Sequence, residues 1–178
     1  MRVRVPHGGE GERLRIHGVR EAVIRFKTMN TRLLMVMHVN VAPALNIGAV
    51  PYGSRRLAPV SGGTFEGPRL RGTILSGSSA DWLLLRSDGV LEMDLRCTLR
   101  TDDGVLVSMS SFGLRHGPPE VVAAIGRGET VDPASYYFRT LPRFETASPA
   151  YSFLSGLVTV AMGDRRPEGP IYTIHEVL

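Results

Sequence analysis

Several charged and aromatic residues are spaced two apart, as chemistry on a β-strand would require. Asp94 and Arg96 form one such pair, and Tyr137 and Arg139 form another, with Glu145 further along the same segment. Residues i and i+2 of a strand point to the same face, about 6–7 Å apart. A carboxylate held there can act as a general base and a tyrosine as a general acid. The candidate catalytic residues are therefore Asp94, Glu145 and Tyr137.

The same positions also suit the binding of a small molecule. Trp82, the only tryptophan, and the aromatic residues Tyr137 and Phe138 offer apolar contact, and an arginine can meet a carboxylate or phenolate. The candidate ligand-binding residues are Trp82, Asp94, Arg96, Tyr137 and Arg139. Two functions stay open. One is the binding of a small, partly aromatic or anionic organic molecule, and the other is a cofactor-independent isomerase, cyclase or lyase.

Other kinds of catalytic site have little support in the sequence. There is no His-Glu-x-x-His motif and no Gly-x-Ser-x-Gly motif, and the five histidines are scattered along the chain. Cys97 stands between apolar neighbours in a strand pattern, which is typical of a buried, inert thiol. We expect no metal site and no cofactor.

A hydrophobic period of two residues dominates the chain from residue 31 onward. The clearest example is residues 90–101, flanked by the turn sequences Ser87-Asp88-Gly89 and Asp102-Asp103-Gly104. One helix is expected, from Pro118 to a stop at Gly126. Strands are expected at 33–41, 69–76, 82–86, 90–101, 105–112, 137–145, 157–162 and 171–177. This pattern predicts a mainly β protein, a single antiparallel β-barrel of about eight strands with one short helix.

The alternation leaves the direction of the polar faces open. Either Leu91, Met93 and Leu95 point inward and the polar residues form a wet outer face, or the polar residues line the lumen. Both function hypotheses need the second arrangement. We therefore expect at least two of Asp94, Arg96, Tyr137 and Arg139 to face a common cavity that includes Trp82.

The stretch GGTFEGPRLRG, residues 62–72, resembles a phosphate-binding loop in composition only. A phosphate loop places its glycines at the start of a helix, whereas Pro68 here leads into the alternating residues Leu70, Thr73 and Leu75. The glycines are better suited to a bulge and a sharp corner in a sheet. We expect Gly67 and Gly72 to serve the backbone and not a ligand.

The charge distribution argues against nucleic-acid binding. The chain of 178 residues has a net charge of +4, and residues 1–30 alone carry seven basic and three acidic groups, so the remainder is neutral. We expect a basic N-terminal extension over residues 1–30, peripheral to a barrel domain over residues 31–178. Residues 14–27 have the spacing of a short amphipathic helix, and Met29 is an alternative start. A single cysteine and the lack of a long apolar run favour a cytoplasmic protein without a membrane segment. A homo-oligomer stays open.

Five segments together resemble one bacterial family. They are RRLAPVSGGTFEGPRLRGTIL, ADWLLLRSDG, DLRCTLRTDDG, YYFRTLPRFET and PAYSFL, in this order. The chain from about residue 33 to 177 is similar to domain-of-unknown-function family 3237, also called uncharacterised protein family 0311. The resemblance implies a small β-barrel without an assigned activity. Ser78-Ser79, Cys97, Phe153 and His175 depart from the residues usual in the family, so a cavity lined by them would differ in shape or ligand.

Overall fold

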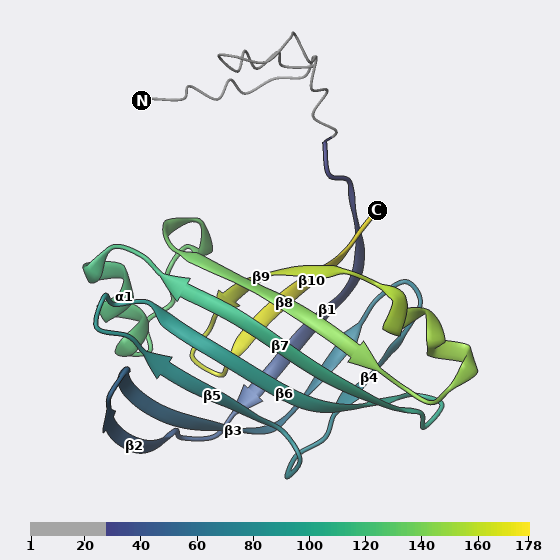
Figure 1. Ribbon diagram of the computed structural model, residues 1–178, viewed down its shortest axis with the longest axis horizontal. Helices are drawn as coiled ribbons and strands as arrows, with labels where there is room; N and C mark the ends of the chain where they lie inside the picture. The colour runs from purple at the N-terminus through teal and green to yellow at the C-terminus, as the bar shows by residue number, and fades with distance from the viewer. Residues whose placement is uncertain (1–27) are drawn as a thin grey trace, which may run out of the picture. The chain divides into compact units, whose positions relative to one another are not determined.

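The computed structural model describes residues 28–178, and the expectations for residues 1–27 lie outside this range. It contains ten strands, one α-helix and two 3-10 helices (Figure 1). The strands are β1 (Thr31–Val41), β2 (Leu45–Val50), β3 (Gly53–Glu66), β4 (Arg71–Ile74), β5 (Ala80–Leu85), β6 (Leu91–Thr101), β7 (Leu106–His116), β8 (Tyr137–Glu145), β9 (Thr159–Arg165) and β10 (Pro170–Val177). The helices are α1 (Pro119–Gly126), η1 (Pro133–Ser135) and η2 (Pro149–Gly156).

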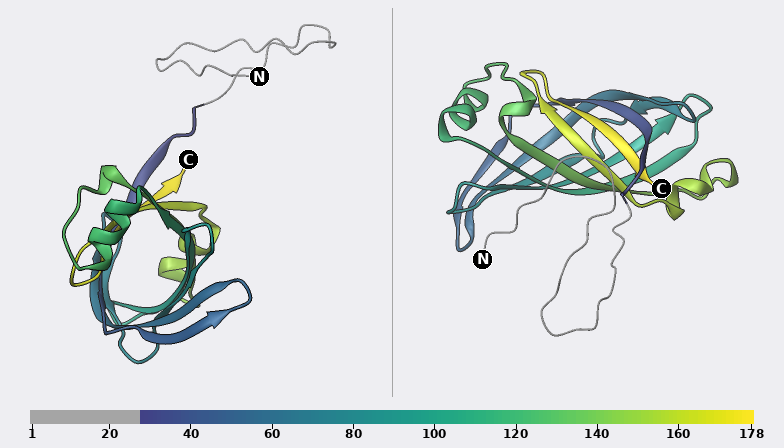
Figure 2. Two further views of the ribbon diagram at one scale, coloured as in Figure 1. Left: turned by 90° about the vertical axis from the view of Figure 1, so that its left-hand side faces the viewer. Right: turned by 90° about the horizontal axis from the view of Figure 1, so that it is seen from above.

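The strands close into an antiparallel barrel of eight positions. The order runs β1, β10, β9, β8, β7, β6 and then β3, and pairing of β1 with β3 closes the ring. Both β4 and β5 fill the position between β6 and β3, whereas β2 forms a hairpin on β3 outside the ring. Figure 2 shows the closed ring end-on. The predicted fold class is confirmed, and closure leaves few strand edges unpaired.

The aliphatic row of β6 points into the barrel. Four residues of this row are buried: Met93, Leu95, Cys97 and Leu99. They belong to one hydrophobic cluster, to which each of the other seven positions of the ring also contributes residues. Alternate residues on the same strand are half-buried or exposed. Burial of the aliphatic side chains is worth roughly 1.5–3 kcal/mol each, so this row fixes which face of β6 is inside.

Two strands were missing from the expected list. β2 and β3 cover residues 45–66, where Pro59 and several small residues weaken the alternation. The stretch at residues 62–72 is the bend from β3 to β4, as the sequence predicted. Gly63 has a φ of +145°, and a Cβ there would lie 2.1 Å from the carbonyl oxygen of His38. These glycines therefore permit close contact between neighbouring backbones.

The two ends of the barrel are covered differently. The helix α1 follows β7 and lies at one mouth, and η2 lies at the opposite end (Figures 1 and 2). Leu154 of η2 is 1% exposed and joins the core, so this end is filled by side chains. The mouth next to α1 is not filled. No helix among residues 28–178 is long and apolar enough to span a membrane.

Candidate binding site inside the barrel

A cavity of about 460 Å³ occupies the half of the barrel next to α1. Its wall combines aliphatic side chains such as Leu83 and Met93 with four charged groups and one tyrosine. The polar residues of the wall are Arg56, Asp81, Arg115, Arg165 and Tyr172. A concave cavity in which several polar groups converge among apolar side chains is typical of a small-molecule site.

Strand alternation explains how these residues come together. Asp81 lies on β5 opposite Leu95 of β6 and shares the inward face with Leu83. Arg115 ends the inward row of β7 and Arg165 ends that of β9, both near the mouth. Tyr172 comes from β10. Five polar side chains from separate strands therefore meet in one space, as barrel tilt allows.

Asp81 is a buried carboxyl group without a full set of hydrogen bonds. The residue is 8% exposed, and its Oδ1 has no hydrogen-bond partner. Burial raises the pKa of Asp81 from 3.8 to about 7, and the nearby Asp94 carboxylate adds to the rise, while Arg115 acts in the opposite direction. At neutral pH this group can therefore both accept and donate a proton.

The two arginines near the mouth lack acidic partners. Within residues 28–178, neither Arg115 nor Arg165 makes a salt bridge, and Nη1 of Arg165 is buried without a hydrogen bond. Burial lowers the pKa of both guanidinium groups, and for Arg115 the positive charge of Arg165 contributes. The charges of Asp81 and Glu168 act on Arg115 and Arg165 only from beyond salt-bridge distance, so these two neighbouring cations create a preference for an anion.

Aromatic rings complete the wall. The Phe138 and Tyr172 rings meet edge to face with centroids 5.4 Å apart, and Cζ of Arg115 lies 5.8 Å from the Phe138 centroid. Burial raises the pKa of Tyr172 well above its usual value, so its hydroxyl stays a hydrogen-bond donor at neutral pH. The backbone N–H of Arg165 donates to Oη of Tyr136 at 2.7 Å, which ties β9 to the start of β8.

The residues that the sequence analysis selected lie elsewhere. Asp94 and Arg96 form an ion pair of 3.1 Å on the outside of β6, and Trp82 is 41% exposed. Tyr137 and Arg139 are exposed on the outside of β8. The expectation that these side chains line the lumen is wrong, because the aliphatic row of β6 takes the inner face. The alternative, in which the aliphatic row of β6 points inward and its polar residues lie on the outer face, describes the structure.

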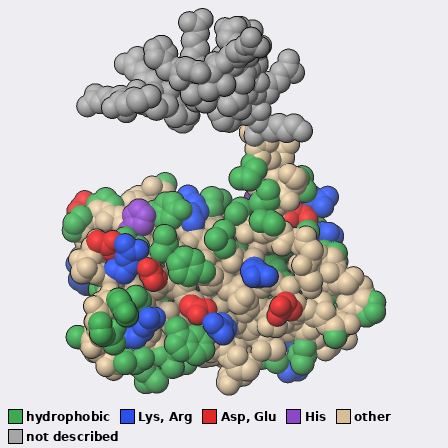
Figure 3. Space-filling model, in the orientation of Figure 1, with side chains coloured by type: hydrophobic (Ala, Val, Ile, Leu, Met, Phe, Trp, Pro, Cys, Tyr) green, Lys and Arg blue, Asp and Glu red, His purple; other side chains and the backbone are tan. Residues whose placement is uncertain are grey.

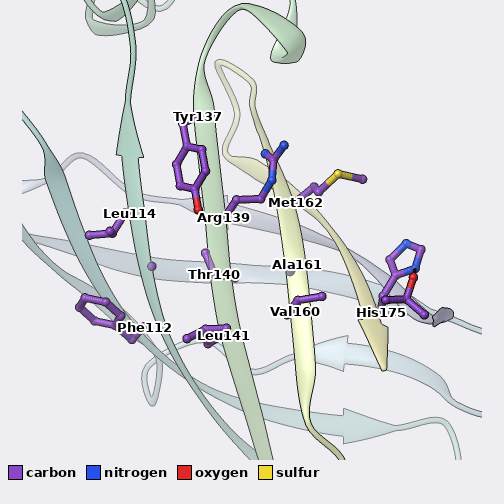
Figure 4. A pocket seen from close by; sticks show the side chains of 12 residues that line it. Phe112, Leu114, Tyr137, Arg139, Thr140, Leu141, Val160, Ala161, Met162 and His175 are labelled. Carbon is purple, nitrogen blue, oxygen red and sulfur yellow. Dashed lines mark hydrogen bonds between the residues drawn. The ribbon is translucent and has the colours of Figure 1, made fainter. Parts of the chain in front are cut away.

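The other candidate general base, Glu145, is also exposed, at the far end of β8. Tyr137 and Arg139 do line a cavity, but it is an open groove of about 490 Å³ on the outer surface (Figure 4). Trp82 is not among its lining residues. A ligand-binding or catalytic role for these exposed residues stays a prediction.

The sequence analysis missed the residues that do line the lumen. The register β5–β6 puts Asp81 on the inner face with Leu95, so the signal was the parity of Asp81 relative to the aliphatic residues of β6. Tyr172 gives the same kind of signal, because it lies two residues before the buried Ile174 and therefore shares the inner face of β10. Arg115 and Arg165 gave no such signal, because they lie near the ends of β7 and β9, and only the pairing of both strands with β8 brings them together.

Neither the cysteine nor a cluster of metal ligands offers chemistry within residues 28–178. Cys97 is buried in the core, and burial raises the pKa of its thiol to about 12, so it is not a nucleophile at neutral pH. Among residues 28–178 no group of three or more His, Cys, Asp or Glu side chains could hold a metal ion. His175 faces the outer groove and Phe153 stacks under Arg69, so neither family departure changes the lumen.

The fold and the lumen define a small, closed β-barrel with an interior cavity at one end. Residues 29–177 match the family described as Protein of unknown function (DUF3237), and the chain belongs to this family.

Two solved structures are of proteins similar to this chain, and a third shares its fold alone. UPF0311 protein RPA1785 of Rhodopseudomonas palustris is 32% identical over 151 residues, which are 85% of this chain and 98% of the relative. Its crystal structure gives a TM-score of 0.83 and covers 86% of this chain and 100% of that chain. A β-barrel-like protein (ABAYE2633) from Acinetobacter baumannii is 36% identical, with a TM-score of 0.75 over 86% of this chain and 99% of that one. An enzyme from Penicillium herquei shares the fold with a TM-score of 0.66 at 15% identity, over 87% and 98% of the two chains.

Proposed function

We propose that the barrel binds a small, partly aromatic, anionic organic molecule in its lumen. The proposal rests on the pair of arginines Arg115 and Arg165, which line the cavity and make no salt bridge within residues 28–178. Unpaired charges in a partly buried site cost free energy in the empty protein, and a bound anion would recover it.

The aromatic character of the ligand follows from the wall. Phe138 and Tyr172 supply ring surfaces, and Met93 and Leu83 supply aliphatic surface around them. A cavity of about 460 Å³ lies in the ordinary size range for small-molecule sites. A flat molecule with one carboxylate or phenolate fits both the charge and the surface.

The proposal is tested with a panel of mono- and bicyclic aromatic carboxylates and phenols, measured by thermal shift and then by calorimetry. We expect at least one binder, and Arg115→Gln and Arg165→Gln should each weaken it at least about tenfold. Arg96→Gln on the outer surface is the matched control and should leave binding unchanged. Equal affinities of all three variants would exclude the lumen as the site.

A second candidate function is cofactor-independent proton transfer on the bound molecule. It is favoured by Asp81, which lines the cavity, whose pKa is raised to about 7 and whose buried Oδ1 has no hydrogen-bond partner. The Asp81 carboxylate would take a proton from a carbon next to a carbonyl, the arginines would stabilise the enolate oxygen, and Asp81 would return the proton to another carbon. This is an isomerisation, and it places the base on Asp81 instead of Asp94 or Glu145.

Deuterium exchange distinguishes catalysis from simple binding. A cyclic aromatic ketone with an acidic C–H bond is incubated in D2O with the protein, and loss of the proton signal is followed by NMR. We expect exchange that rises through a pH near 7 and is lost in Asp81→Asn, whereas Glu145→Gln should match the unmodified protein. Binding without Asp81-dependent exchange across a series of such ketones would leave only the binding function.

A further inference from the structure

The outer face of the barrel from β5 to β9 is unusually apolar for a solvent-exposed sheet. Phe112, Leu141 and Met162 are 51%, 54% and 50% exposed, and Trp82 is 41% exposed. Figure 3 shows hydrophobic side chains between isolated charges of both signs on the face turned to the viewer. The open groove of Figure 4 is part of this surface.

Strand register makes these side chains contiguous. One row across the sheet runs Trp82, Asp94, Phe112 and Leu141, because these residues are paired in succession from β5 to β8. The next row runs Leu114, Arg139 and Met162 from β7 to β9. We call these seven residues the outer patch. Five strands at ~4.8 Å and rows at ~7 Å give the outer patch with its flanking rows an area of roughly 400 Å².

An area of this size needs a partner with matching chemistry. Apolar patches of ~300–600 Å² are the largest found on ordinary monomers and often mark interaction sites. Together with a polar rim, the outer patch approaches the ~800 Å² per partner of a standard protein interface. It is too wide for a small ligand alone and lacks the basic excess of a nucleic-acid or membrane surface.

The two charges of the outer patch favour a second copy of the same chain. Asp94 lies on β6 and Arg139 on β8, on opposite sides of the apolar strand β7 and ~12 Å apart from the strand spacing. A two-fold axis in the plane of the interface, oblique to β7 and crossing it between Phe112 and Leu114, exchanges these two positions. Each Asp94 then meets the partner's Arg139, and Phe112 of one copy packs against Leu141 of the other.

The interactions that Asp94 and Arg139 make within one copy leave both side chains able to pair across the interface. Within residues 28–178 Arg139 makes no salt bridge; it donates to the backbone oxygen of Phe138 and stacks on Tyr137 at 5.3 Å. Asp94 is paired only with the exposed Arg96, and the Asp94 side chain is 45% exposed. The same two-fold axis brings Trp82 against the partner's Met162. The outer patch is therefore self-complementary in both charge and apolar surface.

We propose that this protein forms a two-fold symmetric homodimer through the outer patch, with the axis crossing β7 between Phe112 and Leu114. The proposal does not depend on the lumen, which opens at the α1 end of the barrel.

The dimer is tested by sedimentation velocity on the full chain, from micromolar to several hundred micromolar. We expect a dimer for the unmodified protein and a monomer for Phe112→Asp. Asp94→Arg and Arg139→Asp should each weaken the homodimer at least about tenfold, because each places like charges opposite one another. An equimolar mixture of these two variants should form a heterodimer within a few-fold of the original affinity, because both cross-interface charge pairs are then opposite.

Matched controls separate the interface from general surface effects. Arg71→Asp, on an exposed arginine at the other end of the sheet, and Arg115→Gln in the lumen should leave the dimer unchanged. Circular dichroism confirms that each variant is folded. A monomer at every concentration, a dimer unaffected by Phe112→Asp, or a mixture that stays monomeric would overturn the proposal.

Discussion

Two buried carboxyl groups of this protein respond to their surroundings in opposite ways. Asp81 faces a cavity with one unpartnered oxygen, and burial raises its pKa. Glu176 is 2% exposed but accepts hydrogen bonds from Arg32 at 2.6 Å and Arg69 at 2.8 Å, which lower its pKa despite burial. The ionised form of Asp81 costs folding free energy, which is typical of a functional site, whereas the ion pairs of Glu176 stabilise the fold.

Asp81→Asn should stabilise the protein above neutral pH. Because the folded pKa of about 7 exceeds the unfolded value of 3.8, the folded state takes up a proton and the free energy of unfolding falls as pH rises from about 4 to 7. We expect Asp81→Asn to remove this fall and to gain roughly 1–4 kcal/mol at pH 8. Urea unfolding at pH 5 and pH 8 measures both values. If Asp81→Asn were less stable than the unmodified protein at pH 8, the conclusion that ionised Asp81 destabilises the folded state would be wrong.

Glu176→Gln should lower the free energy of unfolding, and this effect should depend on pH in a more acidic range than the effect of Asp81→Asn. The lowered folded pKa means that Glu176 stabilises the fold above its ordinary pKa of 4.5, and that this contribution is lost as pH falls through the folded value. We expect a loss of about 1–2 kcal/mol at pH 7, since both arginine partners are partly exposed. The difference between the two proteins should shrink toward pH 3 in the same unfolding experiment.

At the scale of elements, the shortest strand depends on a glycine. β4 has four residues and joins β3 to β6, and a Cβ at Gly72 would lie 2.0 Å from the carbonyl oxygen of Arg100 on β6. The φ of Gly72 is not positive, so the reason for glycine here is close backbone approach and not backbone strain.

Gly72→Ala should therefore destabilise the barrel. Separation of β4 from β6 would weaken the ladder, and we expect a loss of about 1–3 kcal/mol in the free energy of unfolding. Gly156→Ala is the matched control, because a Cβ there meets nothing within 4 Å and its φ is not positive. Thermal melts of both variants make the comparison, and a cost as small for Gly72→Ala as for Gly156→Ala would refute the close-approach argument.

At the scale of the whole molecule, the barrel is expected to fold without its N-terminal segment. Residues 31–178 contain every strand of the ring, and contacts within this unit close the barrel through β1 and β3. Deletion of residues 1–28 should change the free energy of unfolding by less than about 1 kcal/mol, measured by denaturant titration. Loss of a cooperative transition would show that the segment belongs to the folded core.

The sequence by itself determined the fold class, most strand positions and the bend at residues 62–72, because alternation and turn residues are local signals. It left open which face of β6 is inside. It favoured Asp94, Arg96, Tyr137 and Arg139 for the lumen because equal parity within a strand shows only that two residues share a face.

Only the closed barrel decided between the two faces. The aliphatic row of β6 gains more from burial than the Asp94–Arg96 pair could recover, since buried charges cost several kcal/mol unless fully paired. Ring closure then brought Asp81, Arg115, Arg165 and Tyr172 from four distant strands to one cavity. Local pattern could not predict that meeting, because it depends on strand order and tilt, which arise from contacts between residues far apart in the chain.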